Sequence, residues 1–269
     1  MLLALAVWLA PGPLRITAPA FRQSDGGTPL PPGFTHVPGA LLFFSFQIEG
    51  YLPTTERKVR LSYKLEALDP QGVAIVEPIA SILDTELHDE DKDWKPRVRQ
   101  EIEIPPLGPS GRYKILVAVS DEVGKTTAKA EIPFEVRGRD VEPSPTLVIR
   151  NFRWFRAEED REPLAKGVYR PGDSVWARFD ITGYRFAEKN RFAVSYGIEV
   201  FRSNGNLLYA QPKAADEQES TFYRKRYLPG VLSLQLDKDI RPDEYTIVLK
   251  VSDQIGDQEI ESRHVFSVE

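Results

Sequence analysis

The densest group of potential metal ligands in the sequence is an acidic run at residues 84–93. It holds six carboxylates in ten residues, and hard oxygen ligands of this kind suit Ca²⁺, which takes six to eight of them. The spacing does not follow the Asp-x-Asp-x-Asp-Gly framework of a calcium-binding loop, and Lys92 interrupts the acids. A solvated connecting loop is the favoured interpretation; a weak Ca²⁺ site is the alternative, and no other cofactor is expected. The ligands of that site would be Asp84, Glu86, Asp89, Asp91 and Asp93.

A second candidate site is the segment at residues 222–227, where three adjacent cations stand between aromatic residues. An Arg beside an aromatic face is a common feature of protein interfaces. The segment therefore predicts a contact with a protein or a glycan. The alternative is an exposed edge whose charges discourage strand pairing. The residues of the predicted contact are Tyr223, Arg224, Lys225, Arg226 and Tyr227.

A third candidate is Trp154, in a stretch that also has aromatic residues at positions 152 and 155. Side chains alternate between the two faces of a strand, so at least one of these rings must point away from the core of its own domain. Two interpretations are open: the aromatic stretch packs against the first half of the chain, or Trp154 is exposed and binds a ligand.

No linear motif of a known catalytic site accompanies these candidates. The chain has three histidines in unlike contexts and no cysteine, which removes thiol catalysis and thiolate metal sites. The nucleophile elbow, the His-Glu-x-x-His motif and glycine-rich phosphate loops are also absent from the sequence, so we expect a protein that is not an enzyme. A pair of carboxylates assembled by folding leaves no linear motif. The alternative is therefore a carbohydrate-binding or accessory domain of an extracellular enzyme system with a carboxylate-based site.

The elements that must position these residues occur twice in the chain. Tyr113 opens a stretch of alternating apolar residues that ends in Ser-Asp-x-x-Gly, and Tyr245 opens the same pattern 132 residues later. Alternation with period 2 that runs into a tight turn predicts a half-buried strand followed by a hairpin. The chain is therefore expected to be a tandem repeat of one all-β domain.

The remaining strands of the two halves also align. Residues 38–51 match residues 171–184, and the first strand of each half is expected at 13–22 and 147–156, with Phe21 matched to Phe155. The strands at 59–66 and 192–199 are each expected to be followed by a hairpin partner, at 73–76 and 207–209. Counting gives about seven strands in each half, which predicts two tandem antiparallel immunoglobulin-like β-sandwiches. The expected divisions are an apolar segment at 1–12, a first sandwich at 13–137, a linker at 138–146 and a second sandwich at 147–269.

The last two strands of each half resemble those of bacterial immunoglobulin-like and fibronectin III-like domains, including macroglobulin-type modules. The resemblance rests on the pattern Tyr…Val-Ser-Asp…Gly…Phe-x-Val. It implies that the tyrosine of each copy forms a corner by hydrogen bonding to backbone upstream. The aspartate of each copy is expected to bond the backbone two residues further on. The structural positions are Tyr113, Asp121 and Gly124 in the first copy and Tyr245, Asp253 and Gly256 in the second.

The first ten residues form an apolar run that is close in length to the hydrophobic region of a signal peptide. Residues 18–20 supply a small-x-small cleavage pattern, although no Lys or Arg precedes the run. Cleavage after Ala20 would remove most of the first strand, so we expect any cleavage to occur before residue 14. The alternative is an apolar arm that packs on the first domain.

Composition narrows the class of partner. The net charge of −5 argues against a nucleic-acid binder, which usually carries a basic domain or stripe. The apolar run is too short to span a bilayer. We therefore expect a non-enzymatic module that is exported to the periplasm or the extracellular space. Its expected role is binding or structural, with a protein or a glycan of the cell envelope as its partner.

Overall fold

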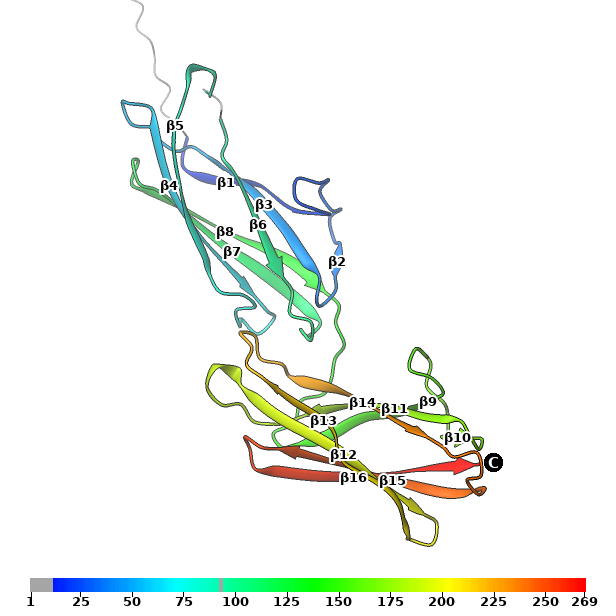
Figure 1. The fold of residues 1–269 in the computed structure, drawn as a ribbon. Coiled ribbons are helices and arrows are strands. Elements are labelled where there is room, and N and C mark those ends of the chain that lie inside the picture. The colour runs from blue at the N-terminus through cyan, green and yellow to red at the C-terminus, as the bar shows by residue number, and fades with distance from the viewer. Residues whose placement is uncertain (1–11, 92–93) are drawn as a thin grey trace, which may run out of the picture. The chain divides into compact units, whose positions relative to one another are not determined.

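The computed structural model describes residues 12–91 and 94–269. The chain is an all-β protein whose strands form two compact units, divided between Arg139 and Asp140. Each unit is an immunoglobulin-like sandwich of one three-stranded and one five-stranded sheet (Figure 1). Residues 1–11, and with them nearly all of the apolar segment, lie outside the described residues.

The first sandwich pairs a sheet of order β1-β3-β6 with a sheet of order β2-β8-β7-β4-β5. The pairing of β2 with β8 is parallel and the others are antiparallel. The strands are β1 (Arg15–Arg22), β2 (Thr35–His36), β3 (Leu41–Glu49), β4 (Lys58–Leu68), β5 (Ile79–Glu86), β6 (Arg97–Glu103), β7 (Gly111–Asp121) and β8 (Thr126–Val136).

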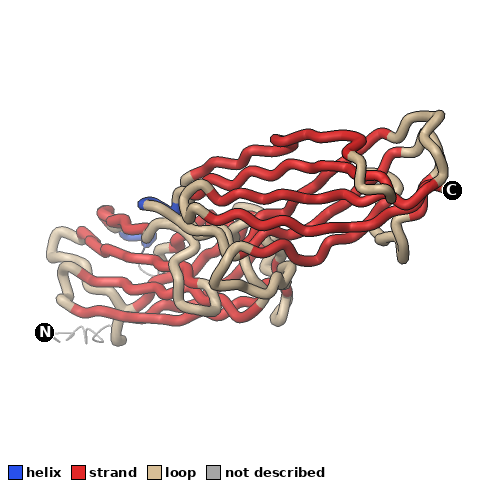
Figure 2. The backbone as a smooth tube through the Cα atoms, turned by 90° about the horizontal axis from the view of Figure 1, so that it is seen from below, coloured by secondary structure: helices blue, strands red, loops and turns tan. Residues whose placement is uncertain are grey.

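The second sandwich repeats this topology, with a sheet of order β9-β11-β14 facing a sheet of order β10-β16-β15-β12-β13. Two 3-10 turns, η1 (Asp89–Asp91) and η2 (Glu188–Asn190), are the helical elements of the described residues, and they are blue in Figure 2. The strands are β9 (Val148–Phe155), β10 (Val168–Tyr169), β11 (Ser174–Thr182), β12 (Phe192–Arg202), β13 (Leu207–Glu219), β14 (Tyr227–Gln235), β15 (Asp243–Asp253) and β16 (Gln258–Val268).

The core of each sandwich follows from the alternation of side chains along its strands. In β7, every second residue from Tyr113 to Asp121 is buried, and the residues between them are partly exposed. β4 and β15 bury one face in the same way. Because a strand turns successive side chains to opposite faces, this period-2 pattern directs one apolar row from each sheet into the space between them.

Two of the predicted hairpin strands differ from the structure. At residues 73–76 the predicted strand is reduced to an isolated bridge between Leu68 and Ala74. This bridge follows a tight turn, in which Asp69 accepts hydrogen bonds from the amides of Gln71 and Val73. In the second domain, β13 continues to Glu219, well beyond the predicted end at residue 209. The acidic run was also expected to be a loop, but its residues 84–86 belong to β5.

The alignment of the first strands was wrong by one residue. Phe21 pairs with Phe44, and Trp154 pairs with Ala177, the residue that matches Phe44 in the second repeat. Trp154 is therefore the counterpart of Phe21, and Phe155 is the counterpart of Arg22. A slip of one residue exchanges the two faces of a strand, so the correction decides which of these side chains lies in the core.

Candidate functional site

The Ser-Asp-x-x-Gly turns are structural elements in both domains. Asp253 is fully buried; its Oδ1 accepts a hydrogen bond from the amide two residues on, and its Oδ2 accepts one from the Arg185 amide at 2.8 Å. Asp121 makes the same two contacts, the second with the Leu52 amide at 2.8 Å. Each carboxylate thus ties its own hairpin to the loop that follows the second long strand. A Cβ on Gly124 or Gly256 would collide with this aspartate.

The tyrosines that open these strands make equivalent contacts. The Tyr113 hydroxyl donates to the Pro109 carbonyl at 2.9 Å, and the Tyr245 hydroxyl donates to the Arg241 carbonyl at 2.8 Å. Both acceptors lie four residues upstream, which is the geometry of a tyrosine corner. These side chains stabilise the fold and are not free to act on a ligand.

The segment at residues 222–227 lies on the surface of the second domain, but the predicted contacts through its two tyrosines are wrong. Tyr223 and Tyr227 are 8% and 7% exposed, so neither ring is available to a partner. The segment is fixed from below: the Tyr184 hydroxyl donates to the Lys225 carbonyl at 2.6 Å, and the Asn190 side chain donates to the Phe222 carbonyl at 2.7 Å.

The three cations of this segment differ in what they contact. The guanidinium of Arg224 lies 4.1 Å above the Phe186 ring and is exposed. Lys225 forms an ion pair with Glu219, and Arg226 is half-buried. Arg224 is therefore the cation of the three that faces solvent. Beside it, Phe222 is 50% exposed.

Trp154 belongs to the core of the second domain. It is 9% exposed and makes edge-to-face contacts with Phe152, Tyr169 and Phe266. The expectation of an exposed, ligand-binding Trp154 is wrong. The prediction that at least one of the three rings points away from the core is confirmed, but by another residue than Trp154. The residue on the outer face of β9 is Phe155, and the Arg178 guanidinium covers its ring at 4.2 Å.

The acidic run forms no metal centre in the part of the chain that the structure describes, where no group of three His, Cys, Asp or Glu side chains could hold an ion. Asp84 lies on β5 and faces Arg60 at 3.7 Å. Glu86, on the same strand, is exposed. Asp91 Oδ2 accepts a hydrogen bond from the His88 amide. The side chain of Asp89 and the whole of Asp93 are not described.

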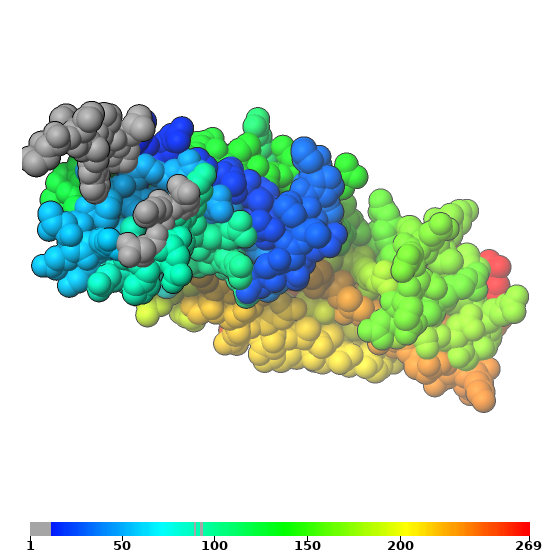
Figure 3. All heavy atoms as spheres, turned by 90° about the horizontal axis from the view of Figure 1, so that it is seen from above, coloured from blue at the N-terminus to red at the C-terminus, as the bar shows by residue number. Residues whose placement is uncertain are grey.

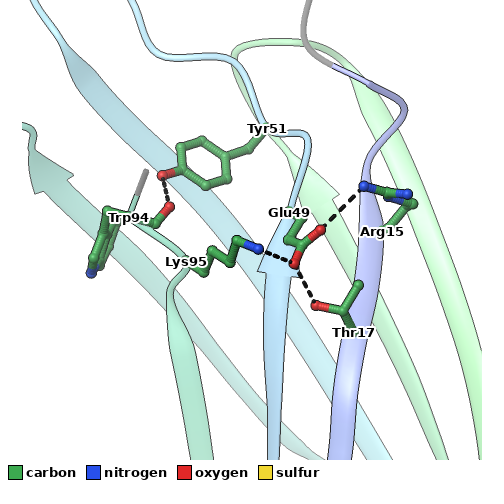
Figure 4. Close-up of polar contacts among 6 residues, drawn as sticks. All are labelled: Arg15, Thr17, Glu49, Tyr51, Trp94 and Lys95. Atoms are coloured by element: carbon green, nitrogen blue, oxygen red, sulfur yellow. Dashed lines mark hydrogen bonds and ion pairs between the residues drawn. The ribbon is translucent and has the colours of Figure 1, made fainter. Parts of the chain in front are cut away.

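A polar cluster that the sequence did not indicate lies next to this run (Figure 4). Glu49 accepts contacts from Lys95 at 2.8 Å, Arg15 at 3.1 Å and Thr17 at 3.2 Å. The hydrogen bond from Lys95 is the main reason why the pKa of Glu49 lies below its usual range. These contacts join β1, β3 and the segment before β6, so the carboxylate is used for structure.

Close to Glu49, the Tyr51 hydroxyl donates to the Trp94 carbonyl at 2.6 Å. This bond is the counterpart of the one from Tyr184 to Lys225 in the second domain. In each repeat, the tyrosine of the Gly-Tyr pair that follows β3 or β11 therefore fixes the segment that precedes β6 or β14. The equivalence could have been predicted from the aligned Gly-Tyr pairs, but the acceptor carbonyls carry no sequence signal.

The chain is thus a protein of two immunoglobulin-like β-sandwiches. No family model and no curated protein matches its sequence. Among solved structures, it is similar to the C-terminal domain of the antigen I/II polypeptide BspA of Streptococcus agalactiae, at 10% identity and a TM-score of 0.35, over 94% of this chain and 100% of that one. The C-terminal domain of the antigen I/II-family protein AspA of Streptococcus pyogenes gives 8% identity and a TM-score of 0.35, over 95% and 100%.

A family 123 glycoside hydrolase from Clostridium perfringens matches at 11% identity and a TM-score of 0.33, over 46% of this chain and 27% of that one. Similarity at this level carries no information about activity or partners. Within the described residues, the structure also contains no helix that is long and apolar enough to cross a membrane.

Proposed function

We propose that the protein is a non-enzymatic, exported binding module, and that the surface formed by Phe222 and Arg224 contacts a protein partner of the cell envelope. One observation carries the proposal: an exposed Arg224 guanidinium stacked on Phe186, with a half-exposed Phe222 beside it. Arginine and aromatic side chains dominate the binding free energy of many protein interfaces.

The rigidity of the backbone supports this proposal. Asn190 and Tyr184 bind the backbone carbonyls of Phe222 and Lys225, so the backbone that carries the exposed pair loses little conformational freedom when a partner binds. The loop that supplies Asn190 also carries Arg185, Lys189 and Arg191, against one acid, Glu188. The excess of positive charge favours a partner with an acidic surface.

Export is supported by the apolar segment at residues 1–10. The binding role is supported by the fold, whose loops can vary while the cores are preserved. Trp154 and Tyr223 cannot serve as exposed platforms for a sugar ring, because both side chains are buried.

The test uses the full chain as bait for envelope extracts. The double variant Phe222→Ser and Arg224→Ser should lose the captured partner. Arg263→Ser should retain it, because Arg263 is an exposed arginine on β16, outside this surface. Recovery that is the same for all three proteins would reject the surface. Cell fractionation with mass spectrometry of the native N-terminus tests export; a chain found in the cytoplasm with residues 1–10 intact would reject that part.

A further inference from the structure

The outer face of the β1-β3-β6 sheet contains a hollow of about 340 Å³, within the size range of small-molecule sites. Its floor is the outer face of β3, where Phe43 and Ser45 lie two residues apart. Arg22 and the loop after β1 form one wall, and Arg99 and Glu101 on β6 form the other. In Figure 3, the blue residues of β1 and its loop and the teal residues of β6 share one face of the first domain.

In the second domain, the position that corresponds to Ser45 carries a much longer side chain. Arg178 is the counterpart of Ser45, as the aligned strands β3 and β11 show. The Arg178 guanidinium lies over Phe155 and donates to the carbonyls of Glu158 and Asp160 in the loop after β9. Its side chain therefore fills the space between sheet and loop. In the first domain, the short side chain of Ser45 leaves that space open.

Two guanidinium groups border the open space in the first domain. Arg22 comes from the position of Phe155; its Nε donates to Ser45 Oγ at 2.9 Å and its Nη1 to the Gly27 carbonyl at 2.6 Å. These contacts use two of the five N–H donors of the side chain. The Arg99 guanidinium, 52% exposed, is 3.6 Å from the Asp25 carboxylate. A guanidinium suits a carboxylate, which it can bind through two parallel hydrogen bonds.

The hollow also contains hydrogen-bond acceptors and an aromatic surface. Asp25 and Glu101 are exposed carboxylates at its rim, and Ser24 supplies a hydroxyl. A simple anion has no hydrogen-bond donors for these acceptors, and the negative charge of the two carboxylates would repel it. A ligand that combines one carboxylate with several hydroxyl donors would satisfy both sets, with its carbon-bound hydrogens against Phe43.

We propose that the hollow bordered by Arg22, Arg99 and Glu101 binds a carboxylate-bearing sugar residue, such as a hexuronic acid unit of an acidic polysaccharide. The two arginines bind the carboxylate, and Asp25 and Glu101 accept hydrogen bonds from the sugar hydroxyls. The site lies in the first domain and does not depend on the Phe222 and Arg224 surface of the second, so either proposal can fail alone.

The experiment is a ligand-observed NMR titration of the full chain with three probes: D-glucuronate, D-glucose and acetate. Glucuronate should bind, and glucose and acetate should bind at least about tenfold more weakly, since each lacks one half of the recognition. Equal binding of glucose would overturn the role of the arginines. Equal binding of acetate would reduce the site to a general anion site, and no binding of glucuronate at millimolar concentration would overturn the proposal.

Three variants locate the site. Ser45→Arg introduces the residue that the second repeat already accommodates, so it should fill the hollow and abolish binding of glucuronate. Arg99→Ser, at a largely exposed position, should weaken binding about tenfold or more and keeps the test valid if Ser45→Arg fails to fold. Arg97→Ser is the matched control, because Arg97 lies on the same face of β6 two residues away and does not line the hollow. Unchanged affinity in Arg99→Ser, or a loss in Arg97→Ser equal to that in Arg99→Ser, would contradict the assignment.

Discussion

At the scale of single residues, the imidazole of His264 is held in surroundings that disfavour its charged form. Its ring lies face to face with Phe152, with 3.4 Å between centroids, and edge-on to Trp154; its Nε2 is 2.8 Å from Ser262 Oγ. These three neighbours carry no charge, and burial lowers the pKa of His264. The pKa of His36 in the first domain is lowered for the same reason.

This shift predicts a loss of stability on mild acidification. The unfolded chain binds protons at an ordinary histidine, near pH 6.5, while the folded chain resists them. The stabilisation is therefore complete above that pH and is lost as the pH falls through the histidine range. We expect the free energy of unfolding to decrease between about pH 7.5 and about pH 5.5, and His264→Gln to flatten this slope whatever its effect on stability at pH 7.5.

His88→Gln is the matched control, because His88 is exposed. Chemical denaturation of the three proteins at each pH measures the slope. If the slope for His264→Gln equals that of the wild type, the protonation of His264 does not contribute to the pH dependence of the free energy of unfolding.

At the scale of elements, each domain has one glycine that lets a loop pass close to the residues just before its first strand. Gly183 has a φ of +82°, and a Cβ there would collide with the Thr146 carbonyl, just before β9. Its counterpart Gly50 has a φ of +77°, and its Cβ would collide with the Pro13 carbonyl. In both repeats, the loop after the long second strand therefore passes so close to the incoming chain that only glycine fits.

Substitution of Gly183 separates this close approach from backbone strain alone. Gly183→Ala should destabilise the second domain by more than about 2 kcal/mol, because strain and collision add. Gly205→Ala should cost about 1 kcal/mol, since Gly205 has a similar φ of +81° but nothing within 4 Å of an added Cβ. Thermal unfolding measures both. Equal losses in the two variants would mean that the chain near Thr146 moves aside without cost.

How far the sequence predicts such elements depends on whether their cause is local. The repeated Tyr…Ser-Asp-x-x-Gly stretches predict β7 and β15 because alternation and turn chemistry are properties of adjacent residues. The one-residue slip at Trp154 could not be found, because an aromatic run reads equally well in either register. The hollow at Ser45 has no local signal either. It depends on the size of the side chain at position 45, which faces the loop after β1, a separate segment of the sequence.

The segment at residues 222–227 also shows that the sequence predicts local features better than contacts with distant loops. Its composition indicates exposed cations and aromatic rings, and Phe222 and Arg224 are exposed. The burial of Tyr223 and Tyr227 depends on the loop that carries Tyr184 and Asn190, which the composition of the segment does not indicate. The prediction that the whole acidic run is a loop was wrong for a different reason. Charged residues are common on exposed edge strands, so a high density of carboxylates does not distinguish β5 from a loop.

At the scale of the whole molecule, the chain has two cores and no disulfide to support either of them. One continuous apolar cluster of the second domain runs from Leu147 to Val268 and contains no residue of the first half. Its first strand is attached by bonds within the domain, such as that from the Leu147 amide to the Gln258 side chain at 3.0 Å. We therefore propose that each half is an independent folding unit.

The proposal predicts that residues 140–269, expressed alone, fold and unfold cooperatively, since a domain of this size can bury a sufficient core of its own. Its melting temperature should lie within about 3 °C of one transition of the full chain. Residues 12–139 should behave in the same way and should retain the Tyr51 and Glu49 contacts, because every partner of those side chains lies in that half. Calorimetry of the two fragments and the full chain provides the measurement. A fragment without a cooperative transition, or a full chain that melts far above both fragments, would mean that the two sandwiches stabilise each other and that the repeat unit is not the unit of folding.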